Sequence, residues 1–520
     1  MTPEQRRILG SSLTGSLDEN LRIIRETFHY PRNSDLTVRV LRIERRAGFV
    51  RAAVVYMVGL ADEETIRDNV IAPMLRLSQT EKPERISARS VMENTISSPR
   101  VRTATTFSQI VDSLVEGGSV VLIDGDDVAL LLGTESAEHR AVSESPTEAV
   151  VRGPHTGFIE NVSANVALVR GMLASPDLVA ERIFVGARSH SPYVIMYMEG
   201  VANPKIVDEV RRRITSLSVD AIGVAGYLSN QIQDTPLDPL PTYIATERPD
   251  TCAFMISEGH VCIMDSSPSA ILVPATIWSL LHSPEDYYIH FLPASLIRLL
   301  RWLALFSTLY ASAIYVAVVT FHPSMLPTEL LFAVAATREA VPFPAAFEVM
   351  FMEAAFELIR EAGLRIPTIV GPTIGIVGAV ILGQAAVQAG IISPILVVIV
   401  AIAGLGSFAI PNYNLSLYVR IVRYLLIGAA AVLGIPGLSL ATLLLMTHIA
   451  GKKSFGVPVT APLVPSFPHS PDLMVVGPPA SMVRRPGHLH PLDAVRRKPV
   501  KGIENPGPPR PRNESGEARS

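Results

Sequence analysis

Carboxylate side chains recur in residues 327–363, a stretch flanked on both sides by strongly apolar sequence. Within it, Glu348, Glu353 and Glu357 follow one another at spacings of five and four residues. At 100° per residue Glu353 and Glu357 share a helical face, whereas Glu348 lies about 140° round from Glu353. Charges at bilayer depth are costly, so they turn toward protein, water or one another. The stretch therefore predicts either an ion path or a buried charge network.

Both interpretations of these carboxylates stay open at the level of sequence. In the first, they line a path for cations, which is repeated around a ring if the chain oligomerises. In the second, Glu357 pairs with Arg360 or Arg338 inside a helix bundle, and the charges have a structural role.

Prolines and apolar side chains beside the carboxylates suggest how such a path would open and close. Pro342 and Pro344 interrupt the helical pattern just before the carboxylates, so we expect a hinge there. Val349 and Phe351 lie next to the carboxylates, and a narrow apolar ring can close a path by dewetting. The sequence thus predicts a gate at Val349 or Phe351 that opens by a small tilt at the prolines.

The elements that must position these residues divide into a soluble half and a membrane half. With 48% hydrophobic and 18% charged residues, the chain is more apolar than soluble proteins usually are. Its long apolar runs predict an all-α polytopic membrane domain of about four to six helices over residues 286–450. The spans are expected near residues 302–321, 343–360, 369–388, 391–410 and 424–448.

Arginines indicate which side of the membrane the connections face. Arg298 and Arg301 precede the first span, and Arg420 and Arg423 are predicted to lie in a loop before the last span. Positive residues favour the cytoplasmic side, so we expect both places to lie there. The basic C-terminal tail favours the same side, whereas five spans would place it opposite. The number of spans therefore stays open.

We interpret the soluble half as two copies of one α/β unit, over residues 30–140 and 150–285. An N-terminal helical segment is expected before them, at residues 1–29. The segments VVYMVGLADEETIRDNV and EGGSVVLIDGDDVALLL align with IMYMEGVANPKIVDEV and EGHVCIMDSSPSAILV at a separation of 141 or 142 residues. Short β-branched and aromatic runs bounded by glycine predict strands, and helical patterns follow them. We expect a mixed α/β sheet with helices packed on it.

Catalytic, cofactor-binding and metal-binding patterns do not emerge. Asp124 and Asp126 read as turn formers between strands. Cys252 and Cys262 are the only cysteines, so we expect no disulfide framework and a cytoplasmic N-terminal domain. The net charge of −3, without a basic stripe interleaved with aromatics, argues against nucleic acid as a partner. We expect no enzyme activity, no cofactor and no metal.

The C-terminal region, residues 451–520, is rich in proline and basic side chains. This composition predicts a mostly disordered tail. Its positive charge would allow contact with lipid headgroups, although a merely solvated tail fits equally well.

Several segments together resemble the A subunit of the GerA-type spore germination receptors. They include SLDENLRIIRETF, VRGPHTGFIENVSANVALVR, MEGVANPKIVDEVRRRI, TFHPSMLPTELLFAVAATREAVPFPAAFE, IGIVGAVILGQAAVQAGIISP and KSFGVPVTAPLVP. The resemblance extends from about residue 15 to residue 465, and the combination of motifs is specific.

This resemblance implies a multi-pass protein of the spore inner membrane. Members of the family are expected to form a homo-oligomeric ring, a germinant-gated channel that releases monovalent cations when germination starts. The implied partners are a transporter-like B subunit, a lipoprotein C subunit and membrane lipid. Two alternatives stay open: an accessory channel protein like SpoVAF of the same family, and a non-conducting scaffold for receptor subunits.

Overall fold

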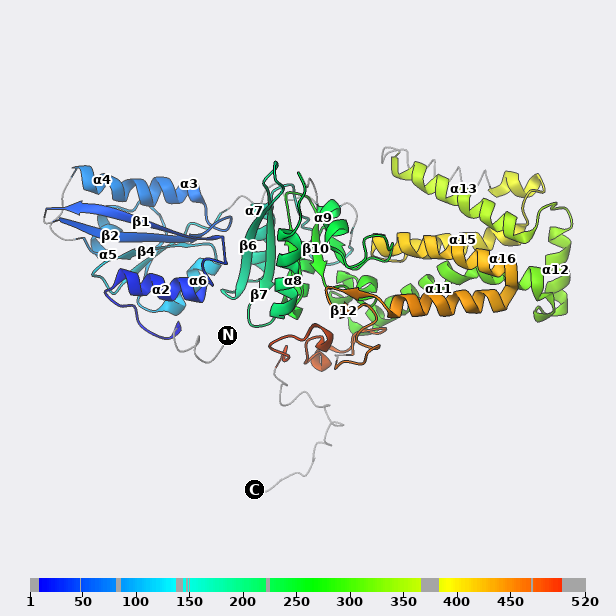
Figure 1. The fold of residues 1–520 in the computed structure, drawn as a ribbon. Coiled ribbons are helices and arrows are strands. Elements are labelled where there is room, and N and C mark those ends of the chain that lie inside the picture. The colour runs from blue at the N-terminus through cyan, green and yellow to red at the C-terminus, as the bar shows by residue number, and fades with distance from the viewer. Residues whose placement is uncertain are drawn as a thin grey trace, which may run out of the picture.

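The computed structural model describes residues 9–46, 48–80, 86–136, 144–145, 148, 150–220, 225–365, 383–468 and 471–497. Two α/β units and a helical bundle follow one another along one long axis, in the order of the chain (Figure 1). The second unit lies between the first unit and the bundle, so it is the unit that can hold the bundle directly.

Each α/β unit is built on a five-stranded sheet with the same strand order. The order is β1-β2-β4-β5-β3 in the first unit and β6-β7-β9-β10-β8 in the second. The first sheet consists of β1 (Leu36–Arg45), β2 (Gly48–Met57), β3 (Val101–Ala104), β4 (Ser119–Ile123) and β5 (Ala129–Leu132). The second consists of β6 (Leu178–Val185), β7 (Ser191–Met198), β8 (Ile244–Thr246), β9 (Val261–Met264) and β10 (Ala270–Val273). The second unit thus repeats the topology of the first.

All strand pairs in these two sheets are antiparallel. The mixed sheet expected from the sequence is therefore wrong. A parallel pair needs a single crossover connection, usually one helix. Between β2 and β4 the chain instead passes through several helices and the edge strand β3, and it returns antiparallel to β2.

Helices cover both faces of each sheet. In the first unit α2 (Leu17–Thr27) and α6 (Phe107–Val115) share a core with one face. The opposite face carries α3 (Glu63–Ile66), a π-helical turn (Arg67–Ile71), α4 (Ala72–Thr80) and α5 (Ala88–Asn94). In the second unit the two faces carry α8 (Pro204–Thr215) with α9 (Ala225–Ile232), and α7 (Val162–Met172) with α10 (Pro249–Glu258). The α7–α10 core continues into the helical bundle without a break.

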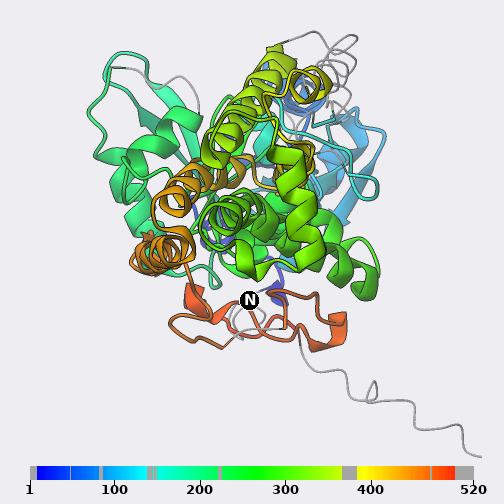
Figure 2. The ribbon, with the colours of Figure 1, turned by 90° about the vertical axis from the view of Figure 1, so that its right-hand side faces the viewer.

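The helical bundle contains helices of very different length. They are α11 (Phe291–Phe321), α12 (Thr328–Arg338), α13 (Ala345–Arg365), α15 (Pro394–Phe408) and α16 (Tyr413–Ala450). Among the described residues, α11 and α16 are long and apolar enough to cross a membrane. Figure 2 shows the bundle end on. The span expected at 369–388 lies largely outside the described residues.

The helix α16 contains a break at Gly434, within the span expected at 424–448. Gly434 has φ 63° and ψ −141°, which is not helical. Glycine is required there, because a Cβ atom would lie 2.9 Å from the Cβ of Phe321 and from Nε2 of His322. The backbone N–H of Ile435 donates to the same His322 nitrogen at 3.4 Å. The break therefore sits against the last residues of α11.

The two halves of α16 run in opposite directions from this break (Figure 1). Beyond the second half, Lys452 forms an ion pair with Asp238 of the second α/β unit. Because α11 also starts at the second unit and ends near the break, the second half of α16 runs antiparallel to α11. The second unit thus holds both the start of α11 and the end of α16.

The C-terminal region is folded over much of its length. The hairpin of β11 (Lys453–Ser454) and β12 (Val457–Pro458) packs on the second unit, where the Ile277 N–H donates to the Val459 carbonyl at 2.9 Å. Residues 471–497 then run beneath this unit. The disorder expected from composition does not describe these parts of the tail.

Candidate functional site

The carboxylates singled out from the sequence lie on one helix of the bundle, α13. This helix begins directly after Pro342 and Pro344, which separate it from α12. Each carboxylate of the set Glu348, Glu353 and Glu357 meets an arginine from a different place in the chain. The cluster is therefore formed by tertiary packing and not by neighbours in sequence.

The Glu353 carboxylate occupies the centre of the bundle. It forms an ion pair with Arg423 of α16 at 2.7 Å, and both side chains are 0% exposed. The Ser312 hydroxyl of α11 donates to the other carboxylate oxygen at 2.7 Å. One carboxylate thus joins α11, α13 and α16, and removing either charge would leave the other buried without a partner.

A second buried carboxylate, Glu348, joins α13 to both of its flanking segments. Arg338, the last residue of α12, donates to one oxygen at 3.1 Å. The backbone N–H of Ser393 donates to the other at 3.1 Å, directly before α15. The Ser393 hydroxyl lies 3.2 Å from the Tyr315 hydroxyl of α11. Glu348 therefore fixes the angle between α12 and α13 around the two prolines.

The third carboxylate, Glu357, lies at the edge of the bundle and is 37% exposed. One oxygen of Glu357 forms an ion pair with Arg420, and Nη1 of Arg360 lies 3.9 Å from the other oxygen. Arg360 donates instead to the Ser407 hydroxyl at 2.7 Å, and its guanidinium covers the Phe408 ring at 4.6 Å. Of the three carboxylates, only this one reaches solvent or a neighbouring molecule in the present arrangement.

Arg420 and Arg423 were expected to mark a cytoplasmic loop, and this expectation is wrong. Both lie inside α16 and are buried, because the helix begins earlier, at Tyr413. A signal for this placement exists in the sequence. The two arginines are three residues apart, and Glu353 and Glu357 are four residues apart. Either spacing places both residues on one helical face, so the two oppositely charged faces can meet.

Positive charge exceeds negative charge in this cluster. In the described part of the chain, Arg360, Arg420 and Arg423 pair with Glu353 and Glu357, and Nε and Nη1 of Arg423 lack a hydrogen-bond partner there. A cation at this level would be repelled while the arginines stay in place. Within the described ranges, no three His, Cys, Asp or Glu side chains gather as a metal site requires.

The two apolar residues expected to form a gate lie on different sides of α13. Val349 is fully buried in the bundle core, whereas Phe351 is 42% exposed. The structure therefore places only Phe351 where it can meet another molecule.

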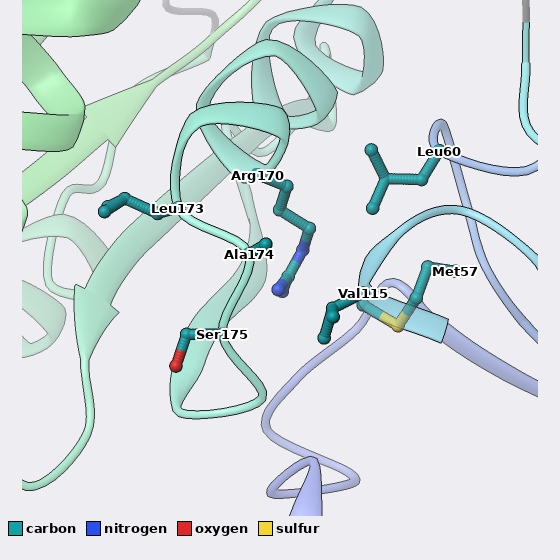
Figure 3. Close-up of a pocket in the computed structure, with 7 residues that line it drawn as sticks. All are labelled: Met57, Leu60, Val115, Arg170, Leu173, Ala174 and Ser175. Atoms are coloured by element: carbon teal, nitrogen blue, oxygen red, sulfur yellow. The ribbon is translucent and has the colours of Figure 1, made fainter. Parts of the chain in front are cut away.

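A small hollow lies between the two α/β units, away from the carboxylates. It lies between Met57, Leu60 and Val115 of the first unit and α7 and the loop after it, which include Arg170, and it is too narrow to hold a water molecule (Figure 3). Arg170 continues across the interface to pair with Asp35 of the first unit, and both side chains are buried. The hollow is therefore closed by a fixed charge pair.

Comparison with known proteins places the chain in a family. The model of the Bacillus/Clostridium GerA spore germination protein matches residues 22–488. Spore germination protein KA of Bacillus subtilis is 38% identical over 83% of this chain and 79% of its own length. The uncharacterized membrane protein YfkQ of the same organism is 38% identical over 84% of each. None of these names describes an enzyme.

A solved structure also matches the N-terminal half. It is the crystal structure of the N-terminal domain of the A subunit of the Bacillus megaterium spore germinant receptor GerK3, 27% identical. The match covers 52% of this chain and 98% of that one, with a TM-score of 0.39. Because this score is low, the description of the two units rests on their own strand pairing. The family assignment rests on the sequence matches: the chain belongs to the GerA spore germination protein family.

Proposed function

We propose that the chain is the A subunit of a nutrient germinant receptor, and that copies of it form a ring-shaped, germinant-gated channel for monovalent cations. The observation that carries this proposal is α13, which brings three carboxylates into the bundle, where arginines of α12 and α16 pair with them. Family membership supports the role in germination. The channel lies in the spore inner membrane, with the α/β units in the cytoplasm.

The arrangement in which Glu348 and Glu353 are paired with arginines corresponds to the closed state of the proposed channel. Glu348 and Glu353 are held by Arg338 and Arg423, so their charges are not available to a cation. Opening tilts α13 about Pro342 and Pro344 and parts Glu353 from Arg423. Separating a buried pair costs about 3–5 kcal/mol, so germinant binding must favour the open state by at least this amount.

The gate is formed in the proposed ring by side chains that line its centre. Phe351 projects from the bundle and would meet its equivalents in neighbouring copies. Val349 acts from inside the bundle, where it keeps α13 seated while the channel is closed. Once α13 tilts, Glu348 lines the path on one side of this apolar ring, and Glu353 and Glu357 line it on the other side.

The proposed topology crosses the membrane six times. Five crossings are α11, α13, α15 and the two halves of α16. The sixth is the span that the sequence predicts near residues 369–388. An even number returns the chain to the side of the α/β units. The ion pair of Lys452 with Asp238 supports this arrangement. A transporter-like B subunit and a lipoprotein C subunit complete the receptor.

Cation release from spores tests the proposal. Spores that carry Glu353→Gln or Glu357→Gln as their only copy should release potassium more slowly than wild-type spores after addition of a mixture of the twenty amino acids. Glu361→Gln, an exposed carboxylate on the same helix, is the matched control. Wild-type release by both variants, at wild-type protein levels, would refute the assignment of the path to these residues.

A second candidate function is a non-conducting scaffold that organises the receptor subunits. The complete burial and pairing of Glu348 and Glu353 favours it, since such groups stabilise a bundle without any path. Purified chain in liposomes distinguishes the two functions. A scaffold gives no ion flux with any variant, whereas a channel subunit gives flux once the arginine that pairs with Glu353 is replaced and the carboxylate is kept.

A further inference from the structure

Residues 471–497, which we call the strap, follow the hairpin after α16 and run beneath the second α/β unit (Figure 2). The strap has no strand or long helix of its own. Among its contacts, one group lies on the start of α11 and another on the end of α10.

The first half of the strap holds the start of α11. Asp472 accepts a hydrogen bond from Arg298 at 2.6 Å and one from the Tyr287 hydroxyl at 2.7 Å. Ser295 of α11 exchanges hydrogen bonds with the backbone of Val476, at 3.1 and 3.0 Å. Four side chains and one backbone segment thus fix the first turns of α11 to the strap.

Asp472 also completes the charge balance at this joint. Arg298 is 0% exposed and lies between Asp472 and Asp286, whose carboxylate is shared with Arg301. With Asp472 the joint contains two positive and two negative charges, and without it one buried positive charge has no counterpart. Burial would raise the pKa of Asp472, but the Arg298 charge and the hydrogen bonds from Arg298 and Tyr287 hold this pKa below its ordinary value. Asp472 is therefore ionised at neutral pH.

The second half of the strap holds the end of α10. The Arg485 side chain donates to the Ser257 carbonyl at 2.9 Å, and Arg496 forms an ion pair with the buried Glu258 at 2.9 Å. The Arg496 guanidinium also covers the Phe254 ring at 5.0 Å. Arg496 lies beyond residue 488, where the match to the family ends. This anchor is thus a feature of the present chain outside the matched region.

The contacts between the strap and α11 are mainly polar. The apolar cluster at this joint contains only Ala294, Val476 and Met482 as fully buried members. Polar contacts can be exchanged for water or for another partner at a small net cost, whereas a large apolar core cannot. The strap can therefore detach from α11 without unfolding either body.

We propose that the strap is a detachable clip that joins α10 to the start of α11 and restrains the first bundle helix in the closed state. This inference rests on the proposed function. Ser312 of α11 donates a hydrogen bond to Glu353, so a movement of α11 would be transmitted to the carboxylates of α13. Anchored at α10 by Arg485 and Arg496, the strap acts on α11 mainly through Asp472.

Amide hydrogen exchange of the full-length chain in membranes, together with potassium release from spores, tests the clip. Asp472→Asn should raise exchange at residues 291–301 about tenfold, the loss of one charge-assisted hydrogen bond, and lower the amino-acid concentration needed for release. Arg497→Gln, which removes the charge of an exposed side chain in the same strap, is the matched control and should change neither.

Two truncations keep the test decisive if Asp472→Asn folds poorly. Truncation after Gly487 removes the Arg496 anchor and should reproduce both effects, while truncation after Arg497 should behave as wild type. Unchanged exchange in the shorter chain would overturn the clip, and so would raised exchange with an unchanged release threshold. Spores that lack the chain show separately whether release depends on it at all, which tests the proposed function and not the clip.

Discussion

Ion pairs on the surface of the α/β units and ion pairs inside the helical bundle are built from the same residue types in opposite environments. In the first unit Arg89 and Glu93 pair on an open helix face, with side chains 84% and 53% exposed. In the bundle Arg423 and Glu353 pair with 0% exposed. An exposed pair contributes little, whereas a broken buried pair leaves an uncompensated charge. The bundle charges therefore decide which helices touch, and the surface charges do not.

The largest expected effect comes from breaking the central pair of the bundle. Glu353→Ala should destabilise the purified chain by about 3–5 kcal/mol, because Arg423 stays buried without its partner. Thermal unfolding in detergent measures the change. The double substitution Glu353→Ala with Arg423→Ala should cost less than the sum of the two single ones. Strict additivity would show that the two charges do not interact.

An intermediate effect is expected at the joint between the second unit and α11. Asp286→Asn should destabilise the chain by about 1.5–3 kcal/mol, because Asp286 holds both Arg298 and Arg301. Asp472 still compensates one of the two arginines, so the loss should stay below that of Glu353→Ala. A larger loss at the joint than in the bundle would reverse the proposed ranking.

The joint should also respond to acid, through His282. Burial lowers the pKa of His282 from 6.5 to about 4, so the folded chain keeps this histidine neutral. The unfolded chain binds a proton at higher pH, and stability should therefore fall as pH drops from about 6.5 to about 4. His282→Gln should flatten unfolding temperature against pH in this window. An equally steep profile in this variant would assign the response to other groups, such as His260.

The smallest effect is expected for the surface pairs of the α/β units. Arg89→Ala should change the free energy of unfolding by only about 0.3–0.5 kcal/mol, and less at high salt. Urea unfolding of the full chain at low and high salt measures this. A cost of more than 2 kcal/mol would remove the distinction between surface and bundle pairs.

Local features of the fold could be predicted from the sequence. The duplication followed from two aligned segment pairs, and Pro342 and Pro344 correctly marked the boundary between α12 and α13. Such features depend on residues near one another in the chain. The GerA resemblance found in the sequence is confirmed by the family match.

Long-range contacts could not be predicted in the same way. The sequence assigned Arg423 to a loop because arginines at the edge of an apolar run usually face the cytoplasm. The spacing of the arginines allows a helical placement, but only packing reveals that Glu353, seventy residues earlier, neutralises Arg423 inside the bundle. The strap was missed for a related reason: its proline-rich composition lacks apolar periodicity, and polar contacts with α10 and α11 order it instead.

Potassium flux from liposomes containing purified Arg423→Gln shows whether Arg423 masks Glu353 in a closed cation path, and it needs no germinant. If Arg423 masks Glu353 in a closed path, this variant should leak potassium faster than wild type. The double substitution Arg423→Gln with Glu353→Gln should lose the leak, because the freed carboxylate is gone, and Arg89→Gln serves as the control. A folded Arg423→Gln chain that leaks no faster than wild type would show that Arg423 does not mask Glu353 in a cation path.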